Sequence, residues 1–246
     1  IRIVLAEQNT GVIGWLQYVG LQNEQMTTLA WSIFAGITCG IIASCLTLNP
    51  RRLYWPTATA LTLIMIASLL DSQSTSLTRP DQLMFSQFLL GFGSAFFLAP
   101  AMLAGIGGVI ADQRNLVSFS VLFGMSQNIG GLLGSAILGT FQTWREKFHS
   151  SQLADQITTL NPVINERLQL YAQQYQSQLG DSALLNVQAS AVLQNLSTLE
   201  ANILAYNDTY LLTAAISAAT LLWVFWRLLR LRITAHIALK RATGSK

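Results

Sequence analysis

Charged side chains are scarce in this chain, and their scarcity excludes an ordinary soluble domain. Asp, Glu, Lys and Arg make up 10% of the 246 residues, while hydrophobic residues make up 52%. A soluble domain carries about 25% charged residues, because it needs a charged surface. Two cysteines and two histidines are too few for a disulfide framework or a metal centre. The net charge of +3 is small. We therefore expect no enzyme, no cofactor, no metal and no nucleic-acid partner.

What the chain does have is long runs without any charge. Five runs lack Asp, Glu, Lys and Arg, and they cover residues 25–50, 53–70, 82–111, 115–144 and 209–226. Crossing a hydrocarbon core about 30 Å thick takes roughly 20 apolar residues of helix. The sequence predicts an all-α membrane protein with five transmembrane helices, over residues 26–48, 53–70, 84–110, 116–141 and 207–231.

The flanking charges predict an orientation and a domain plan. Basic residues gather at Arg51, Arg52 and Arg114 and in the tail at 232–246, and such residues mark cytoplasmic loops. The N-terminus is then outside and the C-terminus inside a bacterial inner membrane. Residues 1–25 read as an external connection from a missing preceding span. Residues 142–206, which are rich in Gln, Asn and Ser, read as an external polar insertion that is partly helical; a loosely ordered loop is the alternative.

Polar residues inside the runs are the candidates for function. Ser126, Gln127 and Asn128 lie near the middle of the 116–141 helix. A buried amide without a partner costs several kcal/mol, so these residues either bond to another helix or line a wet cavity. Intramembrane ionisable residues are the usual proton carriers, and no run contains one. Asp71, Asp112 and Asp208 lie at span ends, where we expect solvated ends or helix caps, and a proton-carrying carboxylate is expected elsewhere.

The 84–110 helix carries an aromatic face and small residues. Phe92 and Phe96 are four residues apart and share a face, while Gln87 lies on another. The face packs against lipid or helices, or forms an aromatic wall of a cavity for a lipophilic substrate. Small residues let helix backbones approach closely. The glycines predicted to serve helix packing are Gly36, Gly40, Gly91, Gly124, Gly130, Gly131, Gly134 and Gly139.

Together these segments resemble one family. The stretch GFGSAFFLAP at 91–100, the 118–139 segment, the long polar insertion and the last helix with its basic tail look like the C-terminal part of a major facilitator superfamily transporter. The resemblance is to the fourteen-span drug:proton antiporters of the EmrB/QacA type. It implies most of a C-terminal half-bundle, with the first, third and fourth helices lining a central cavity. Some family members have an ionisable side chain near the position of Gln127, which is neutral here.

The resemblance implies a function and partners. We expect the C-terminal fragment of a proton-coupled multidrug efflux transporter, which supplies one wall of the cavity and does not transport alone. Its expected partners are the lipid bilayer, a lipophilic small molecule, the missing N-terminal half and a periplasmic adaptor protein. The alternatives are a transporter of a metabolite or siderophore-like solute from the same superfamily, and a non-transporting membrane scaffold that binds a periplasmic adaptor.

Overall fold

The computed structural model describes residues 2–49, 53–107, 113–156, 166, 169–171, 173 and 182–243, and all regular structure in these ranges is helical. A 3-10 turn at Val4–Ala6, a π-helical segment at Gln8–Ile13 and α1 at Gly14–Tyr18 come first. A 3-10 turn at Asn23–Met26 leads into the longer helices. These are α2 (Thr27–Thr47), α3 (Tyr54–Asp71), α4 (Pro80–Ile106), α5 (Gln113–Gln156) and α7 (Ser182–Thr243).

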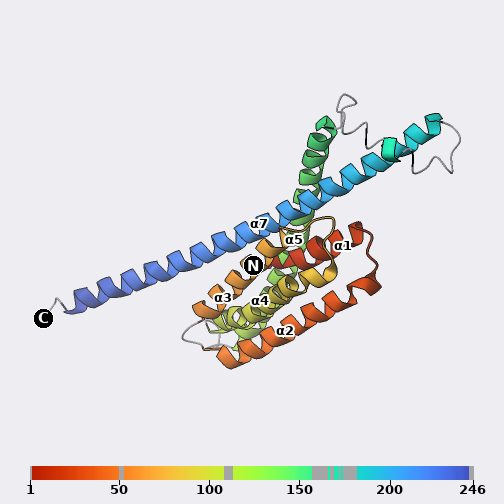
Figure 1. The fold of residues 1–246 in the computed structure, drawn as a ribbon. Helices are drawn as coiled ribbons and strands as arrows, with labels where there is room; N and C mark the ends of the chain where they lie inside the picture. The colour runs from red at the N-terminus through yellow and green to blue at the C-terminus, as the bar shows by residue number, and fades with distance from the viewer. Residues whose placement is uncertain are drawn as a thin grey trace.

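The helices form a bundle with one long helix lying across it. α4 packs against both α2 and α3, α3 also packs against α7, and α7 packs against α5. In Figure 1, α7 crosses the bundle and extends beyond it on both sides, and the C-terminus lies at one far end. Within the described ranges, four helical stretches are long and apolar enough to cross a membrane: Asn23–Thr47, Pro80–Ile106, Asn115–Asp155 and Val187–Arg230. The predicted helix at 53–70 forms as α3 but is not one of these four.

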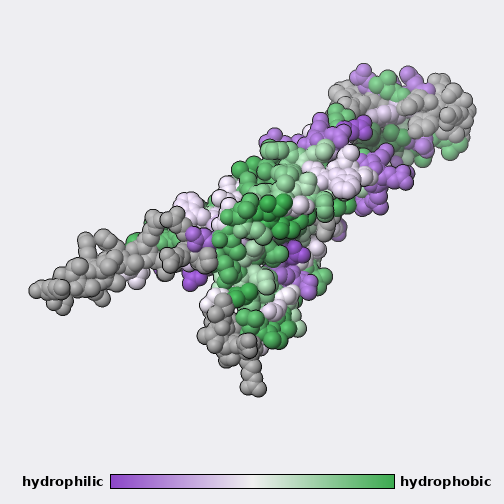
Figure 2. Space-filling model, turned by 90° about the horizontal axis from the view of Figure 1, so that it is seen from below, coloured by the Kyte–Doolittle hydropathy of each residue, from purple (hydrophilic) through white to green (hydrophobic). Residues whose placement is uncertain are grey.

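Apolar surface surrounds the middle of the molecule. Figure 2 shows hydrophobic residues over the central bundle, and hydrophilic residues gathered toward the end at which α7 begins. Large side chains such as Trp31, Phe34 and Leu46 of α2 are 65%, 59% and 81% exposed. Exposing these side chains to water would cost free energy, whereas contact with lipid chains would not. The molecule is an all-helical, multi-pass membrane protein.

Glycines allow α2 and α4 to touch through their backbones. A Cβ at Gly36 would overlap the carbonyl oxygen of Phe88, and a Cβ at Gly40 would lie 2.5 Å from the carbonyl oxygen of Phe92. From the other side, a Cβ at Gly91 would lie 2.9 Å from the carbonyl oxygen of Ile33. The structure therefore places these three glycines at the closest approach of the two helices.

α5 and α7 are longer than the sequence predicts. Its 62 residues make α7 about 93 Å long, roughly three times the thickness of the hydrocarbon core. Both helices extend into the predicted insertion at 142–206. α5 continues to Gln156 and covers its beginning, and α7 starts at Ser182 and covers its end. Most of the residues between these two positions lie outside the described part of the chain.

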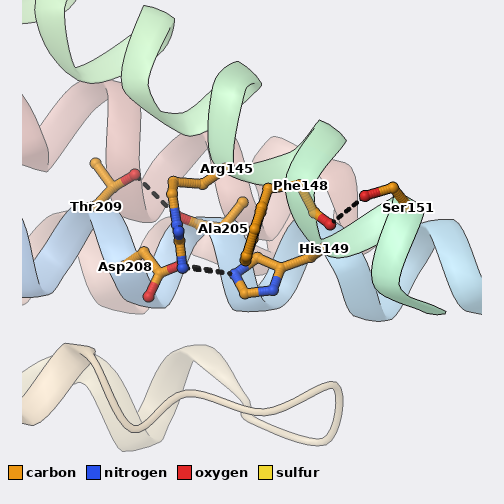
Figure 3. A network of polar contacts seen from close by, with 7 residues as sticks. All are labelled: Arg145, Phe148, His149, Ser151, Ala205, Asp208 and Thr209. Carbon is orange, nitrogen blue, oxygen red and sulfur yellow. Dashed lines mark hydrogen bonds and ion pairs between the residues drawn. The ribbon is translucent and has the colours of Figure 1, made fainter.

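A cluster of polar side chains joins α5 and α7, and we call Arg145, His149 and Asp208 the α5–α7 clasp (Figure 3). Arg145 Nε donates to Asp208 Oδ2 at 2.6 Å, and His149 Nε2 lies 2.6 Å from the same oxygen. The Arg145 guanidinium also lies 4.7 Å from the ring centroid of Phe148. The expectation of a cap or a solvated end therefore needs correction for Asp208, whose carboxylate ties two helices together.

The N-terminal residues belong to the bundle. The sequence predicts an external connection over 1–25, whereas in the structure Trp15 and Leu16 are fully buried in a core cluster with Leu29 and Tyr210. α1 ends in a Schellman motif, in which Leu21 N–H donates to the carbonyl of Leu16 and Gly20 adopts a φ of +93°. This turn reverses the chain into α2, and the described segment before it packs against α3, α5 and α7.

Candidate functional site: a buried pair of carboxyl groups

Two carboxyl groups are buried where the N-terminal segment, α3, α4 and α7 meet. Glu7 lies between the 3-10 turn and the π-helical segment, and Asp71 is the last residue of α3. Both side chains are 0% exposed, and the two carboxyl groups are close enough to interact electrostatically. Asp71 was expected to be a solvated end or a cap. That expectation is wrong, because the N-terminal segment and α4 cover the end of α3.

Neutral donors from α4 hold Asp71. Ser86 Oγ donates to Asp71 Oδ1, and Gln87 Nε2 donates to Asp71 Oδ2 at 2.8 Å. Because Ser86 and Gln87 are adjacent at the start of α4, one turn of helix supplies a donor to each carboxylate oxygen. Burial disfavours the charged form of an acid, whereas hydrogen bonds of this kind favour it, so the two donors offset part of the cost of burying Asp71.

Glu7 is held by a single donor. Ser68 Oγ donates to Glu7 Oε2 at 3.0 Å, and Ser68 lies one turn before Asp71 on α3. The other oxygen, Glu7 Oε1, is buried and has no hydrogen-bond partner among the described residues. Glu7 is therefore less completely satisfied than Asp71, and its free oxygen is where a proton would be added.

Two further buried polar atoms near the pair also lack partners within the described ranges. They are Gln87 Oε1, on the amide that donates to Asp71, and the hydroxyl oxygen of Tyr210. The ring of Tyr210 reaches the site because residue 11 is glycine: a Cβ there would lie 2.8 Å from Tyr210 Cε1 and 3.2 Å from Glu7 Cγ. Buried polar atoms are usually hydrogen-bonded. Three such atoms without a partner among the described residues lie on or beside the two acids.

No basic side chain neutralises the pair in the part of the chain that the structure describes. The recorded ion pairs there both involve Asp208. Moving one uncompensated carboxylate out of water costs several kcal/mol, and two like charges in a low dielectric add mutual repulsion. The described residues also contain no group of three or more His, Cys, Asp or Glu that would hold a metal ion. A pair in which both groups are charged is therefore unfavourable in these surroundings.

Gln87, a cavity candidate from the sequence, is placed in this centre. Its side chain is 0% exposed, and its amide is committed to Asp71. The aromatic residues of the same helix are stacked along it, since the ring centroids of Phe92 and Phe96 are 5.5 Å apart with an interplanar angle of 24°. Phe96 and Trp55 line an open pocket of about 460 Å³ between α2, α3 and α4. The polar face of α4 thus contacts the buried carboxyl pair, and its aromatic face contacts the open pocket.

The polar residues of α5 lie away from the buried pair. Ser126 and Asn128 are exposed and Gln127 is half-buried, and Ser126 Oγ donates to the carbonyl of Phe123 in its own helix. Gly134 lies against the N-terminal segment, where a Cβ would be 2.7 Å from the carbonyl oxygen of Ile3.

The remaining glycines of α5 divide into two pairs. Gly130 and Gly131 lie beside the side chain of Arg2, whereas a Cβ at Gly124 or Gly139 would meet no atom within 4 Å. The face that carries Ser126 and Asn128 is therefore open in this structure.

Sequence reasoning missed the pair and the clasp for identifiable reasons. Glu7 lies in the predicted external connection at 1–25, and Asp71 directly follows the second charge-free run and was taken for a span end. His149 lies in the predicted polar insertion and was given no role, and in the structure its partners are Asp208 and Arg145. One available signal was the polar spacing on α3, because Ser68 and Asp71 are three residues apart on the face that carries the buried Ile64. Asp112 lies outside the described residues.

Comparison with known proteins supports a transporter relationship. The fold defines an all-helical, multi-pass membrane protein with a buried acidic centre. The chain is 28% identical over 130 residues to the multidrug export protein EmrB of Escherichia coli strain K12, and equally so to EmrB of E. coli O157:H7. The match covers 53% of this chain but only 23% of either relative. No family model and no solved structure matches the chain.

Proposed function

We propose that this chain is part of a proton-coupled multidrug exporter of the major facilitator type, and that Glu7 and Asp71 take part in its proton step. The observation that carries the proposal is the buried carboxyl pair without a basic partner among the described residues. The similarity to EmrB supplies the transporter class. The sequence indicated that the proton-carrying acid would be elsewhere, and this proposal moves it into the chain.

The surroundings of the two acids suggest a division of work. Asp71 receives a donor on each oxygen, so it is the group that stays charged. Glu7 has a free oxygen and is the group that gains and loses the proton. The pair lies near the end of the bundle at which α3 ends and α4 begins, and we propose that protons reach it from that side of the membrane. In the proposed orientation this side is the outside, from which protons enter.

The substrate part of the proposal rests on the open pocket beside Phe96 and on the exposed face of α5. Stacked Phe92 and Phe96, together with the exposed amide of Asn128, offer an apolar wall with a few polar groups, which is the usual make-up of a binding cavity. We propose a lipophilic small molecule as substrate and the rest of the transporter as the opposite wall. The parts of α5 and α7 that extend beyond the bundle are the proposed contact for a periplasmic adaptor protein.

The experiment uses the protein expressed from its complete reading frame and reconstituted in liposomes with an imposed pH gradient. Efflux of a lipophilic cationic dye is measured for the wild type, Glu7→Gln and Asp71→Asn. Each variant is expected to lose at least tenfold of its gradient-driven efflux, because the proton no longer binds where it is needed. Gradient-independent exchange of dye across the membrane should be kept, since the substrate wall is intact.

Asp81→Asn and Glu24→Gln are the matched controls. Both side chains are exposed, so each variant loses a carboxylate without touching the buried pair and should retain wild-type efflux. Wild-type gradient-driven efflux in both Glu7→Gln and Asp71→Asn would remove these residues from the proton step. Loss of dye exchange together with gradient-driven efflux would show a structural role instead.

A further inference from the structure

Two arginines near the end of α7 are stacked on tryptophans. The Arg230 guanidinium lies 4.0 Å from the ring centroid of Trp226, and the Arg227 guanidinium lies 5.5 Å from that of Trp223. We call these four residues the Trp–Arg face of α7. Trp223 and Trp226 are 54% and 49% exposed, so other parts of the bundle leave this face uncovered.

The stacking sets the depth of the two charges. Each arginine bends back over the tryptophan four residues earlier, which is the direction in which helical side chains point. Along α7 that direction leads back to the apolar stretch at 209–226. The guanidinium groups therefore lie level with the indole rings instead of reaching out into water. Indoles prefer the headgroup region of a bilayer, so both charges are held at the depth of lipid phosphates.

These positive charges have no counter-ion along the helix. Asp208 is the last acidic residue in the chain, and it lies about 28 Å before Arg227 along α7. Its carboxylate is already bonded to Arg145 and His149. The chain adds further positive charge after Arg230 and no negative charge.

Exposed apolar side chains lie along the adjacent stripe of α7. Leu222 and Phe225 precede Arg227, Leu229 lies between the two arginines and Ile233 follows Arg230, and these four side chains are between 46% and 69% exposed. A ligand of this face must therefore offer an anionic group at the level of the indoles and apolar chains beside it. A guanidinium pairs with phosphate through two parallel N–H bonds, and it does so best when stacking holds its plane.

We propose that the Trp–Arg face of α7 binds the headgroup of an anionic phospholipid in the leaflet at which α7 leaves the membrane. The phosphate bonds to Arg227 and Arg230, and the acyl chains lie against the apolar side chains above them. A free phosphate would gain only the first contact. This role is separate from transport, and it anchors the long helix by its end.

The test measures lipid selectivity in nanodiscs. In the first series, the protein is placed in phosphatidylcholine that contains increasing fractions of brominated phosphatidylglycerol. In the second series, brominated phosphatidylcholine takes the place of the brominated phosphatidylglycerol. Quenching of tryptophan emission gives the preference for the anionic lipid. The quenching that disappears in the double variant Trp223→Phe/Trp226→Phe isolates the signal of this face.

Wild-type protein should prefer phosphatidylglycerol, and the preference should fall about fivefold for each of Arg227→Gln and Arg230→Gln. Arg79→Gln removes the same charge from an exposed side chain at the start of α4 and should leave the preference unchanged. If the double glutamine variant does not fold, molar salt should abolish the wild-type preference instead, because salt screens exposed charges.

Three outcomes would overturn the proposal. They are equal quenching by both lipids in the wild type, a preference that survives loss of both arginines or molar salt, and displacement of the lipid signal by millimolar inorganic phosphate. The last result would assign the face to a free anion.

Discussion

The α5–α7 clasp should contribute measurably to the stability of the protein. Arg145, His149 and Asp208 are 23%, 14% and 24% exposed, so about three-quarters of the cluster is shielded from water. A hydrogen bond to a charged group contributes about 1.5–3 kcal/mol, and breaking a fully buried pair costs about 3–5 kcal/mol. With partial exposure, Asp208→Ala should lower the free energy of unfolding by about 2–3 kcal/mol.

Two smaller effects adjust this value. Alanine forms helix better than aspartate by about 0.5 kcal/mol, which offsets part of the loss at position 208. Arg145→Ala also removes the contact of the guanidinium with the ring of Phe148 at 4.7 Å, which adds about 0.5–1 kcal/mol. The double variant Arg145→Ala/Asp208→Ala should then be about 1–2 kcal/mol more stable than the sum of the single effects predicts.

The assay is reversible unfolding in mixed micelles, followed by circular dichroism as the fraction of denaturing detergent rises. Lys147→Ala is the matched control, because Lys147 is exposed between the clasp residues of α5, and it should change stability by less than about 0.5 kcal/mol. A coupling energy below about 0.5 kcal/mol would refute the reasoning. It would show that Arg145 and Asp208 are independently solvated and that other contacts hold α5 against α7.

Two further predictions concern side chains at close contacts. Gly36→Ala should lower the free energy of unfolding by about 1–3 kcal/mol, because the new Cβ would overlap a backbone carbonyl of α4. Gly124→Ala meets open space and should leave the free energy of unfolding unchanged or raise it by up to about 1 kcal/mol. The same unfolding assay checks both variants, and equal effects would contradict the close approach of α2 and α4. Tyr210→Phe should raise the free energy of unfolding by about 1 kcal/mol, and with it the melting temperature, because it removes a buried hydroxyl without a partner among the described residues. A lower melting temperature would mean that this hydroxyl is bonded.

The helices α2, α3 and α4 could be predicted from the sequence because each one coincides closely with a charge-free run. The predicted helices at 26–48 and 53–70 end within one or two residues of α2 and α3. The predicted start of the third helix, Met84, is four residues late, because Pro80 begins α4 and Asp81 lies in its first turn. Proline is favoured at the first position of a helix and an acid near its N-terminus. Both residues therefore belong to the helix because of their position at its N-terminus, which a hydropathy pattern does not detect.

The lengths of α5 and α7 could not be predicted from hydropathy. Residues 142–156 and 182–206 are polar, and the sequence assigns them to a separate, partly helical insertion instead of to the adjoining membrane helices. Gln, Glu, Lys, Ala and Leu are good helix formers whatever their surroundings, so a helix continues past the apolar stretch until something stops it. Arg145 and His149 lie on the polar continuation of α5, which explains why neither had an assigned role, and Asp208 lies just after the polar part of α7.

The buried pair shows a limit of reading membrane proteins by their charge-free runs. Such a reading defines a span by the absence of Asp, Glu, Lys and Arg, so an acid inside the bundle ends a run and is counted as a boundary. What buries Glu7 and Asp71 is tertiary: Ser68 is 61 residues from Glu7, and Tyr210 comes from the last helix. The local pattern that remains is small and polar residues beside each acid, with Gly11 making room for Tyr210 and Ser86 and Gln87 facing Asp71. An acid at the end of a run, accompanied by serine or amide side chains inside the neighbouring runs, is therefore better read as a buried group with its donors than as a solvated end.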